Sequence, residues 1–199
     1  LAAGASGTRT AELSVNNLAG SVTVGFSYNR PVVSSVYHVD HNANGPTTGD
    51  VSVTVLGFHF GIIDYTSVTV RVLPTLCTST EWRSDTSVRC LLAAGASGTR
   101  TAELSVNNLA GSVTVGFSYN RPVVSSVYHV DHNANGPTTG DVSVTVLGFH
   151  FGIIDYTSVT VRVLPTLCTS TEWRSDTSVR CLLAAGASGT RTAELSVNN

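Results

Sequence analysis

Residues 51–57 read VSVTVLG, and residues 67–73 read SVTVRVL. In both stretches valine or leucine alternates with small polar residues, which is the period-2 pattern of a strand with one buried face. Glycine, proline, asparagine and aspartate interrupt such stretches, and no helical period of useful length appears. The sequence therefore predicts an all-β fold, an Ig-like β-sandwich of about six or seven short strands. The other strands are expected over Val32–Val39, Ser87–Ala93, Thr101–Asn108 and Ser112–Tyr119.

The chain is a tandem repeat with a period of 91 residues. Leu1–Leu91 recurs without a change as Leu92–Leu182, and Leu183–Asn199 begins a third copy. Duplicated domains normally diverge, so identical copies indicate recent duplication, homogenisation, or a section of a longer array. We expect the last of these, because LAAGASGTRTAELSVNN both begins and ends the chain.

Two short Asn-Arg-Pro segments, Asn29–Pro31 and Asn120–Pro122, separate the last strand of one repeat from the first strand of the next. Proline restricts its own backbone and that of the preceding residue, so we expect a stiff junction with Arg121 and Pro122 as interface candidates. The expected domains are residues 1–30 as the C-terminal strands of a preceding repeat, 31–121 as a complete domain, and 122–199 as the next domain without its last strand.

The composition argues against two classes of protein. All 11 basic residues are arginine, 13 residues are acidic and the net charge is −2, whereas nucleic-acid binding needs a basic surface. No apolar run reaches the length of about 18 residues that a membrane-spanning helix needs. Serine and threonine make up 23 residues of the repeat 31–121, so we expect a hydroxyl-rich, nearly neutral surface. Such a surface gives little electrostatic protection against association and leaves O-glycosylation open.

Each repeat contains two cysteines, Cys77 with Cys90 and Cys168 with Cys181. The even count and close spacing suit a local disulfide and do not match zinc-ligand spacing. A disulfide in every repeat indicates an oxidising, extracellular or cell-surface setting. The alternative is two buried free thiols in each repeat.

Several short motifs follow one another in a distinctive order. They are the turn GPTTG at Gly45–Gly49, the sequence GFHFG at Gly57–Gly61, the cysteine pair, and FSY at Phe117–Tyr119. In this order the repeat resembles the IPT/TIG family of Ig-like domains over its whole length. The resemblance implies an Ig-type sandwich with paired cysteines in extracellular members. Members occur in plexin-like and Met-like receptor ectodomains, in repetitive surface proteins, beside carbohydrate-active enzymes, and in transcription factors whose basic DNA-binding loops are not found here. The family predicts the fold better than the function.

Residues 38–50, HVDHNANGPTTGD, contain the D-x-N-x-N-G that begins many calcium loops. The twelfth loop position is Val51 instead of a bidentate glutamate, and strands rather than helices are expected on both sides. Asn44–Pro46 are turn formers by conformation alone, so the sequence favours a turn. The alternative is a weak calcium site of Asp40, Asn42, Asn44 and Asp50.

Other side chains have two interpretations each. Trp82 could stack on a sugar or a neighbouring chain, or it could cover the disulfide and the edge of the core. Phe58, Phe60, Ile62 and Ile63 form an apolar cluster that is either core or an interface with the next domain. No G-x-S-x-G motif or other catalytic constellation is present, so we expect neither enzymatic activity nor a cofactor.

The first functional hypothesis is a structural one: an extracellular array that self-associates into a rod or filament and carries O-linked glycans. Identical repeats allow identical interfaces, and a contact that is not self-complementary propagates into a fibre. The second is an adhesion or receptor stalk that holds a distant ligand-binding domain away from the cell. A third is an accessory domain beside a carbohydrate-active enzyme. Self-association of the repeats distinguishes the first two.

Overall fold

The computed structural model describes residues 7–38, 42–62, 67–129, 134–153 and 158–197. All secondary-structure elements among the described residues are β-strands, which confirms the all-β prediction. The chain divides into two compact units. The first comprises Leu1–Ala43, Val51–Ala93 and Arg100–Phe117, and the second comprises Asn44–Asp50, Ala94–Thr99 and Ser118–Asn199.

An N-terminal hairpin is formed by β1 (Gly7–Val15) and β2 (Leu18–Tyr28), which pair only with each other among the described strands. Asn16 and Asn17 join them with φ angles of 50° and 63°. Two consecutive left-handed residues form the type I′ turn that suits a two-residue hairpin, and asparagine tolerates this conformation.

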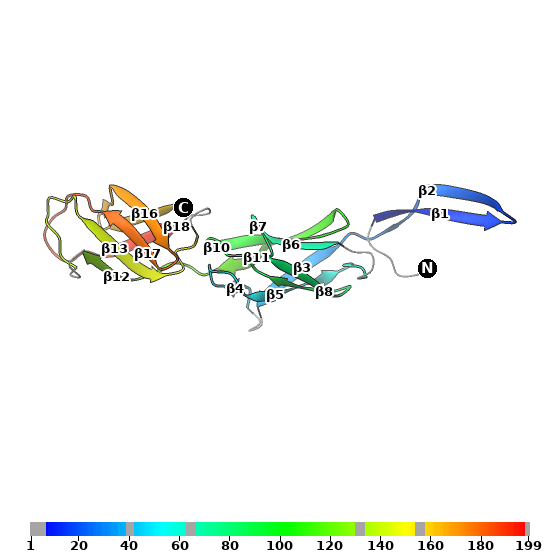
Figure 1. Cartoon of the computed structure of the whole chain (residues 1–199), viewed down its shortest axis with the longest axis horizontal. Helices are drawn as coiled ribbons and strands as arrows, with labels where there is room; N and C mark the ends of the chain where they lie inside the picture. Colours follow the sequence, from blue (N-terminus) through cyan, green and yellow to red (C-terminus); the bar gives the residue numbers. More distant parts are fainter. Residues whose placement is uncertain (1–6, 39–41, 63–66, 130–133, 154–157, 198–199) are drawn as a thin grey trace. The chain divides into compact units, whose positions relative to one another are not determined.

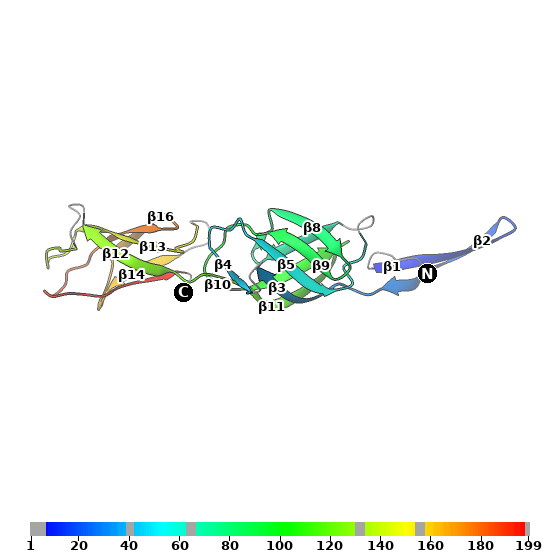
Figure 2. The same cartoon turned by 90° about the horizontal axis from the view of Figure 1, so that it is seen from below.

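Residues 32–119 form two sheets (Figures 1 and 2). One has the order β3-β5-β9-β8, with all neighbours antiparallel, and the other has the order β4-β11-β10-β6-β7. The first sheet consists of β3 (Val32–His38), β5 (Ser52–Phe58), β9 (Ser87–Leu91) and β8 (Ser79–Ser84). The second consists of β4 (Asn44–Gly45), β11 (Leu109–Tyr119), β10 (Gly98–Val106), β6 (Val68–Val72) and β7 (Thr75–Leu76).

The alternating residues build the core as expected. Val53 and Val55 of β5 are buried, whereas their polar neighbours are partly exposed. Val70 of β6, Leu104 of β10 and Phe117 of β11 are buried in the other sheet. Period-2 alternation places one set of side chains on the buried face of each sheet, so this pattern in the sequence is sufficient to predict the core.

The second copy repeats this architecture over residues 123–197. Its sheets have the orders β12-β13-β17-β16 and β15-β14-β18, and β18 lies at the edge of its sheet. The strands are β12 (Val123–His129), β13 (Ser143–Phe149), β17 (Ser178–Leu182), β16 (Ser170–Ser175), β15 (Thr166–Leu167), β14 (Val159–Val163) and β18 (Ala193–Val197).

Three local expectations need correction. Ser79–Ser84 is a strand that we did not predict, because Glu81 and Arg83 form an exposed ion pair there and mask the alternation. Charged side chains are typical of edge strands. The strand expected over Thr101–Asn108 ends at Val106, since Asn107 and Asn108 are the hairpin turn. Asn44–Gly45 is not the turn but a short parallel strand beside β11, and the turn lies at Pro46–Gly49, where the Gly49 amide donates to the Pro46 carbonyl at 3.3 Å.

Candidate functional site

A disulfide connects the two sheets of each copy. Cys77 follows β7 and Cys90 lies on β9 of the opposite sheet, with Cα atoms 5.9 Å apart and both side chains buried. Cys168 and Cys181 form the equivalent disulfide, so none of the four cysteines is a free thiol. Because the disulfide lies in the core, it stabilises the fold and offers no reactive sulfur at the surface.

Two of the predicted calcium candidates make other contacts, Asn44 through its side chain and Asn42 through its backbone carbonyl. The Asn44 side-chain oxygen accepts a hydrogen bond from the Ser118 hydroxyl at 2.7 Å, and its amide donates to Asn120. The Asn42 carbonyl accepts from the His38 amide at 2.8 Å, and Asp50 is exposed with φ of 55°. Asp40 lies outside the described residues. Among the residues that the structure describes, no group of three or more His, Cys, Asp or Glu side chains could hold a metal ion.

The tryptophan of each repeat is half-buried and anchored by one hydrogen bond. The Trp82 indole N–H donates to the Gly61 carbonyl at 3.1 Å, and Trp173 makes the same bond to Gly152. In the second copy, Trp173 packs against the buried cluster that contains Cys168 and Cys181. This arrangement favours the role of covering the disulfide and the core edge.

The apolar cluster after β5 is divided between core and surface. Phe60 is fully buried, so it belongs to the core, whereas Phe58 is 56% exposed. Ile62 is half-buried, and Ile63 lies outside the described residues. Phe58 and Ile62 therefore remain the surface candidates of this cluster.

The Asn-Arg-Pro segments are attached to neighbouring residues by hydrogen bonds that occur in both copies. Asn29 and the His59 ring lie 3.3 Å apart, and Asn120 and the His150 ring lie 3.2 Å apart. In the second unit, the backbone N–H of Asn120 also donates to the Gly45 carbonyl at 2.8 Å. Arg121 is exposed and Pro122 is half-buried. The conserved geometry in the two copies shows that this asparagine is a structural part of the segment.

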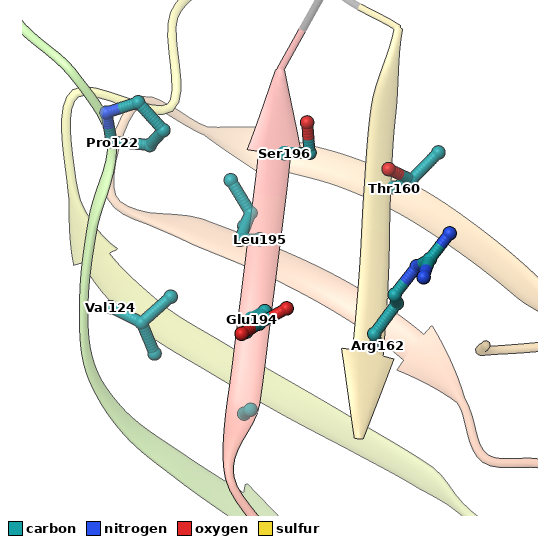
Figure 3. A pocket seen from close by; sticks show the side chains of 8 residues that line it. Pro122, Val124, Thr160, Arg162, Glu194, Leu195 and Ser196 are labelled. Atoms are coloured by element: carbon teal, nitrogen blue, oxygen red, sulfur yellow. The ribbon is translucent and has the colours of Figure 1, made fainter. Parts of the chain in front are cut away.

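A groove beside β18 is the main feature that the sequence did not reveal directly. It has a volume of about 710 Å³ and is lined by residues of β14, of β18 and of the segment at the start of β12 (Figure 3). Pro122, Val124, Ala193 and Leu195 supply apolar surface, and Thr160 and Arg162 supply polar groups.

No helix among the described residues is long and apolar enough to cross a membrane. No curated protein sequence matches the chain.

Solved structures resemble the chain in fold. The surface glycan-binding protein PbSGBP-B from Prevotella bryantii is 11% identical, with a TM-score of 0.55 over 87% of this chain and 41% of that chain. The extracellular region of plexin A4 is 15% identical, with a TM-score of 0.37 over 83% of this chain and 16% of that chain. The present chain thus spans less than half of either protein, and the first likeness supports the sandwich fold.

The sequence itself matches the IPT/TIG domain family twice, over residues 31–119 and 122–199. These two segments cover most of the chain and coincide with the two pairs of sheets, so the resemblance seen in the sequence is confirmed. The chain belongs to the IPT/TIG domain family and is a tandem of its Ig-like β-sandwiches.

Proposed function

We propose that the chain is part of an extracellular, non-catalytic array of identical IPT/TIG domains that self-associates into a rod or filament. The observation that carries the proposal is the complete identity of the repeats. A quasi-one-dimensional assembly needs one interface that recurs along its length, and identical repeats present the same surface at each position.

The junctions support a stiff array. Each Asn-Arg-Pro segment is short, and its asparagine is held by a hydrogen bond to a histidine ring in both copies. A flexible linker would instead be rich in glycine and serine and would make few such bonds. The half-buried or buried prolines at positions 31 and 122 add backbone restriction.

The chemistry of the surface supports an extracellular location and a glycan coat. A buried disulfide in each domain is stable outside the cell, where thiols are oxidised. Many hydroxyls are exposed, including those of Ser34 and Thr69 on strands and of Thr78 between β7 and β8. With a net charge of only −2, hydration by attached sugars would limit lateral aggregation better than charge repulsion would.

The second candidate is a stalk that presents a ligand-binding domain. It uses the same stiff junctions, but its repeats need not associate. Surface glycan-binding proteins such as PbSGBP-B share the fold, and this favours keeping a binding role as the alternative.

Electron microscopy of the native, full-length material distinguishes these functions. The proposal predicts long fibres of constant width in which the 91-residue repeat can be traced, with density beyond the protein at serine or threonine. Separate slender rods that end in a different head domain would contradict it and would establish the stalk.

A further inference from the structure

The second compact unit crosses the boundary between the two repeats. Besides Ser118–Asn199, it includes Asn44–Asp50 and Ala94–Thr99, which are connecting segments of the first repeat. Within this unit the Thr47 side chain is fully buried, and its hydroxyl donates a hydrogen bond of 2.5 Å to Oδ1 of Asp176. Hydroxyl groups bonded to a carboxylate typically lie about 2.5–2.7 Å from it. A side chain of the first repeat is thus bonded to a carboxylate of the second.

The turn that carries Thr47 has the same backbone form in both repeats. The Gly49 N–H donates to the Pro46 carbonyl at 3.3 Å, and the Gly95 N–H donates to the Thr47 carbonyl at 2.9 Å. The equivalent pairs of the second repeat, around Thr138, are bonded at the same distances. The fold of one repeat is therefore sufficient to hold the turn. A binding element that is ordered in advance loses less conformational freedom when it docks.

The carboxylate that receives this hydroxyl is also held in advance. The Gly152 N–H donates to the same Oδ1 atom of Asp176 at 2.8 Å, and the Gly152 carbonyl accepts the Trp173 indole N–H at 3.1 Å. In the first repeat, Asp85 accepts from the Gly61 N–H at 2.8 Å in the same way. Both repeats therefore contain the threonine turn and the matching carboxylate, so the same joint can form wherever one repeat follows another.

A second set of hydrogen bonds leads from the same segment towards the second repeat. The Asn44 side-chain amide donates to Oδ1 of Asn120, and the backbone N–H of Asn120 donates to the Gly45 carbonyl at 2.8 Å. The side-chain nitrogen of Asn120 lies 3.2 Å from Nε2 of His150. The segment is thus attached at two separate points, one through Thr47 and one through Asn120.

We propose that the segment Asn44–Asp50 of each repeat is a docking element for the repeat that follows it in the chain, and that Thr47 and Asp176 are the pair that couples the two repeats. A hydrogen bond to a charged group contributes more to stability than one between neutral groups, and Thr47 is shielded from water. The inference deepens the proposed array, on which it rests for its biological meaning, because it assigns the contact by which one repeat stabilises the next.

Unfolding of the second copy in the 199-residue chain tests the coupling. Trp82→Phe leaves Trp173 as the only tryptophan, so the fluorescence reports on the second copy. Thr47→Val, a change of nearly equal shape in the first repeat, should lower the ratio of folded to unfolded second copy about tenfold, because it removes a hydrogen bond to a carboxylate. In a chain that already contains Asp176→Ala, Thr47→Val should have little further effect, since the two substitutions remove the same bond.

Two matched controls are available in the same chain. Thr48→Val changes the neighbouring residue of the same turn, which is exposed. Thr138→Val makes the identical substitution within the second copy itself, where this threonine is also exposed. Each control should change the ratio of folded to unfolded second copy by no more than about twofold. A substitution in the first repeat should therefore affect the second copy more than the same substitution made inside it.

A distance measurement tests the joint directly. Nitroxide labels on Thr69→Cys and Thr160→Cys occupy equivalent exposed positions of the two repeats, and all four native cysteines are in disulfides. Pulsed electron paramagnetic resonance should give a narrow distribution of label–label distances for the chain with Thr47 intact. Thr47→Asp places a second carboxylate against Asp176 and should broaden the distribution through like-charge repulsion. Thr138→Asp should leave it narrow.

Three outcomes would overturn the inference: an effect of Thr47→Val no larger than that of Thr48→Val, full additivity of Thr47→Val with Asp176→Ala, or equally broad distance distributions with and without Thr47→Asp. Fibres of the native material together with any of these outcomes would reject the joint and leave the proposed function standing. A coupled joint in native rods that do not associate would keep the joint and reject the filament.

Discussion

Residues 31–108 and 122–199 have the same sequence but not the same environment. Leu104 and Ala102 of the first copy are fully buried, whereas Leu195 and Ala193 of the second are partly exposed. Val33 and Val72 are buried, and their counterparts Val124 and Val163 are only half-buried. The first copy has the strand β11 beside β10, whereas β18 of the second copy lies at the edge of its sheet. One strand therefore completes the burial that the other strands of the sandwich begin.

The comparison extends to the connection after β3. Asn44–Gly45 is a short strand beside β11, whereas its counterpart, residues 135–136, has no strand assignment. In the first copy the Tyr119 ring lies against Gly95, and both are buried. In the second copy Gly186 has open space around it and is exposed. The last strand thus orders loops as well as the core.

The two copies can be observed separately. The chain has two tryptophans, Trp82 in the first copy and Trp173 in the second. Trp173→Phe leaves fluorescence that reports on the first copy, and Trp82→Phe leaves fluorescence that reports on the second. Denaturant titrations of these two backgrounds give a free energy of unfolding for each copy.

The largest expected effect is the truncation of a β11 side chain. Phe117→Ala should lower the free energy of unfolding of the first copy by about 3–5 kcal/mol, because the Phe117 side chain is almost fully buried. The same substitution at its exposed counterpart, Phe26→Ala, should change it by about 0.5 kcal/mol or less. Equal effects of the two substitutions on the Trp82 transition would contradict a special role for β11.

Removal of a disulfide should have the next largest effect. Cys77→Ser with Cys90→Ser should cost the first copy about 3 kcal/mol, the loop-closure contribution expected for so short a loop. Cys168→Ser with Cys181→Ser should cost the second copy a similar amount and unfold it at lower denaturant, since it starts with less buried surface. The comparison would be refuted if the second copy without its disulfide unfolded at a higher denaturant concentration than the first copy without its disulfide.

The third largest effect should come from adding a methyl group at equivalent glycines, Gly95 and Gly186, which should change the stability of the two copies differently. A Cβ atom at Gly95 would lie 2.5 Å from the Tyr119 ring, whereas at Gly186 it would have nothing within 4 Å. Gly95→Ala should therefore destabilise the first copy by about 1–3 kcal/mol through overpacking. Gly186→Ala should change the stability of the second copy by no more than about 0.5 kcal/mol. If both substitutions prove neutral, Tyr119 is not held against this loop.

The smallest effect should be the same in both copies. Trp82→Phe and Trp173→Phe each remove a 3.1 Å hydrogen bond from the indole N–H to a glycine carbonyl. Neither bond involves a residue of β11. Each should cost about 1 kcal/mol, measured by calorimetry as equal shifts of the two transitions. Clearly unequal shifts of the two transitions would mean that β11 also changes the contribution of the tryptophan to stability.

Much of this fold was predictable because alternation in the sequence directly encodes which face of a strand is buried. Val53, Val55 and Val70 follow that rule. The strand Ser79–Ser84 was not predictable in this way, because an edge strand needs no apolar alternation and its Glu81–Arg83 pair resembles a loop. The short strand at Asn44–Gly45 was also missed, since it exists only through long-range pairing with β11.

The candidate site was harder to predict than the fold. The groove beside β18 is lined by Pro122, Val124 and Leu195 among others, and no local motif in these residues marks it. The motif that did attract attention, around Asn42 and Asn44, has a structural explanation in the contacts of Asn44 with β11 and Asn120. The local sequence motif therefore indicated a turn or a metal site, whereas in the structure the Asn44 side chain binds Ser118 of β11 and Asn120.

The most direct test of this account is to measure the unfolding of the two copies side by side through Trp82 and Trp173. The account predicts that the second copy unfolds at lower denaturant than the first, because β11 completes the first core and the groove beside β18 is open. Coincident transitions at low concentration, or a more stable second copy, would contradict it.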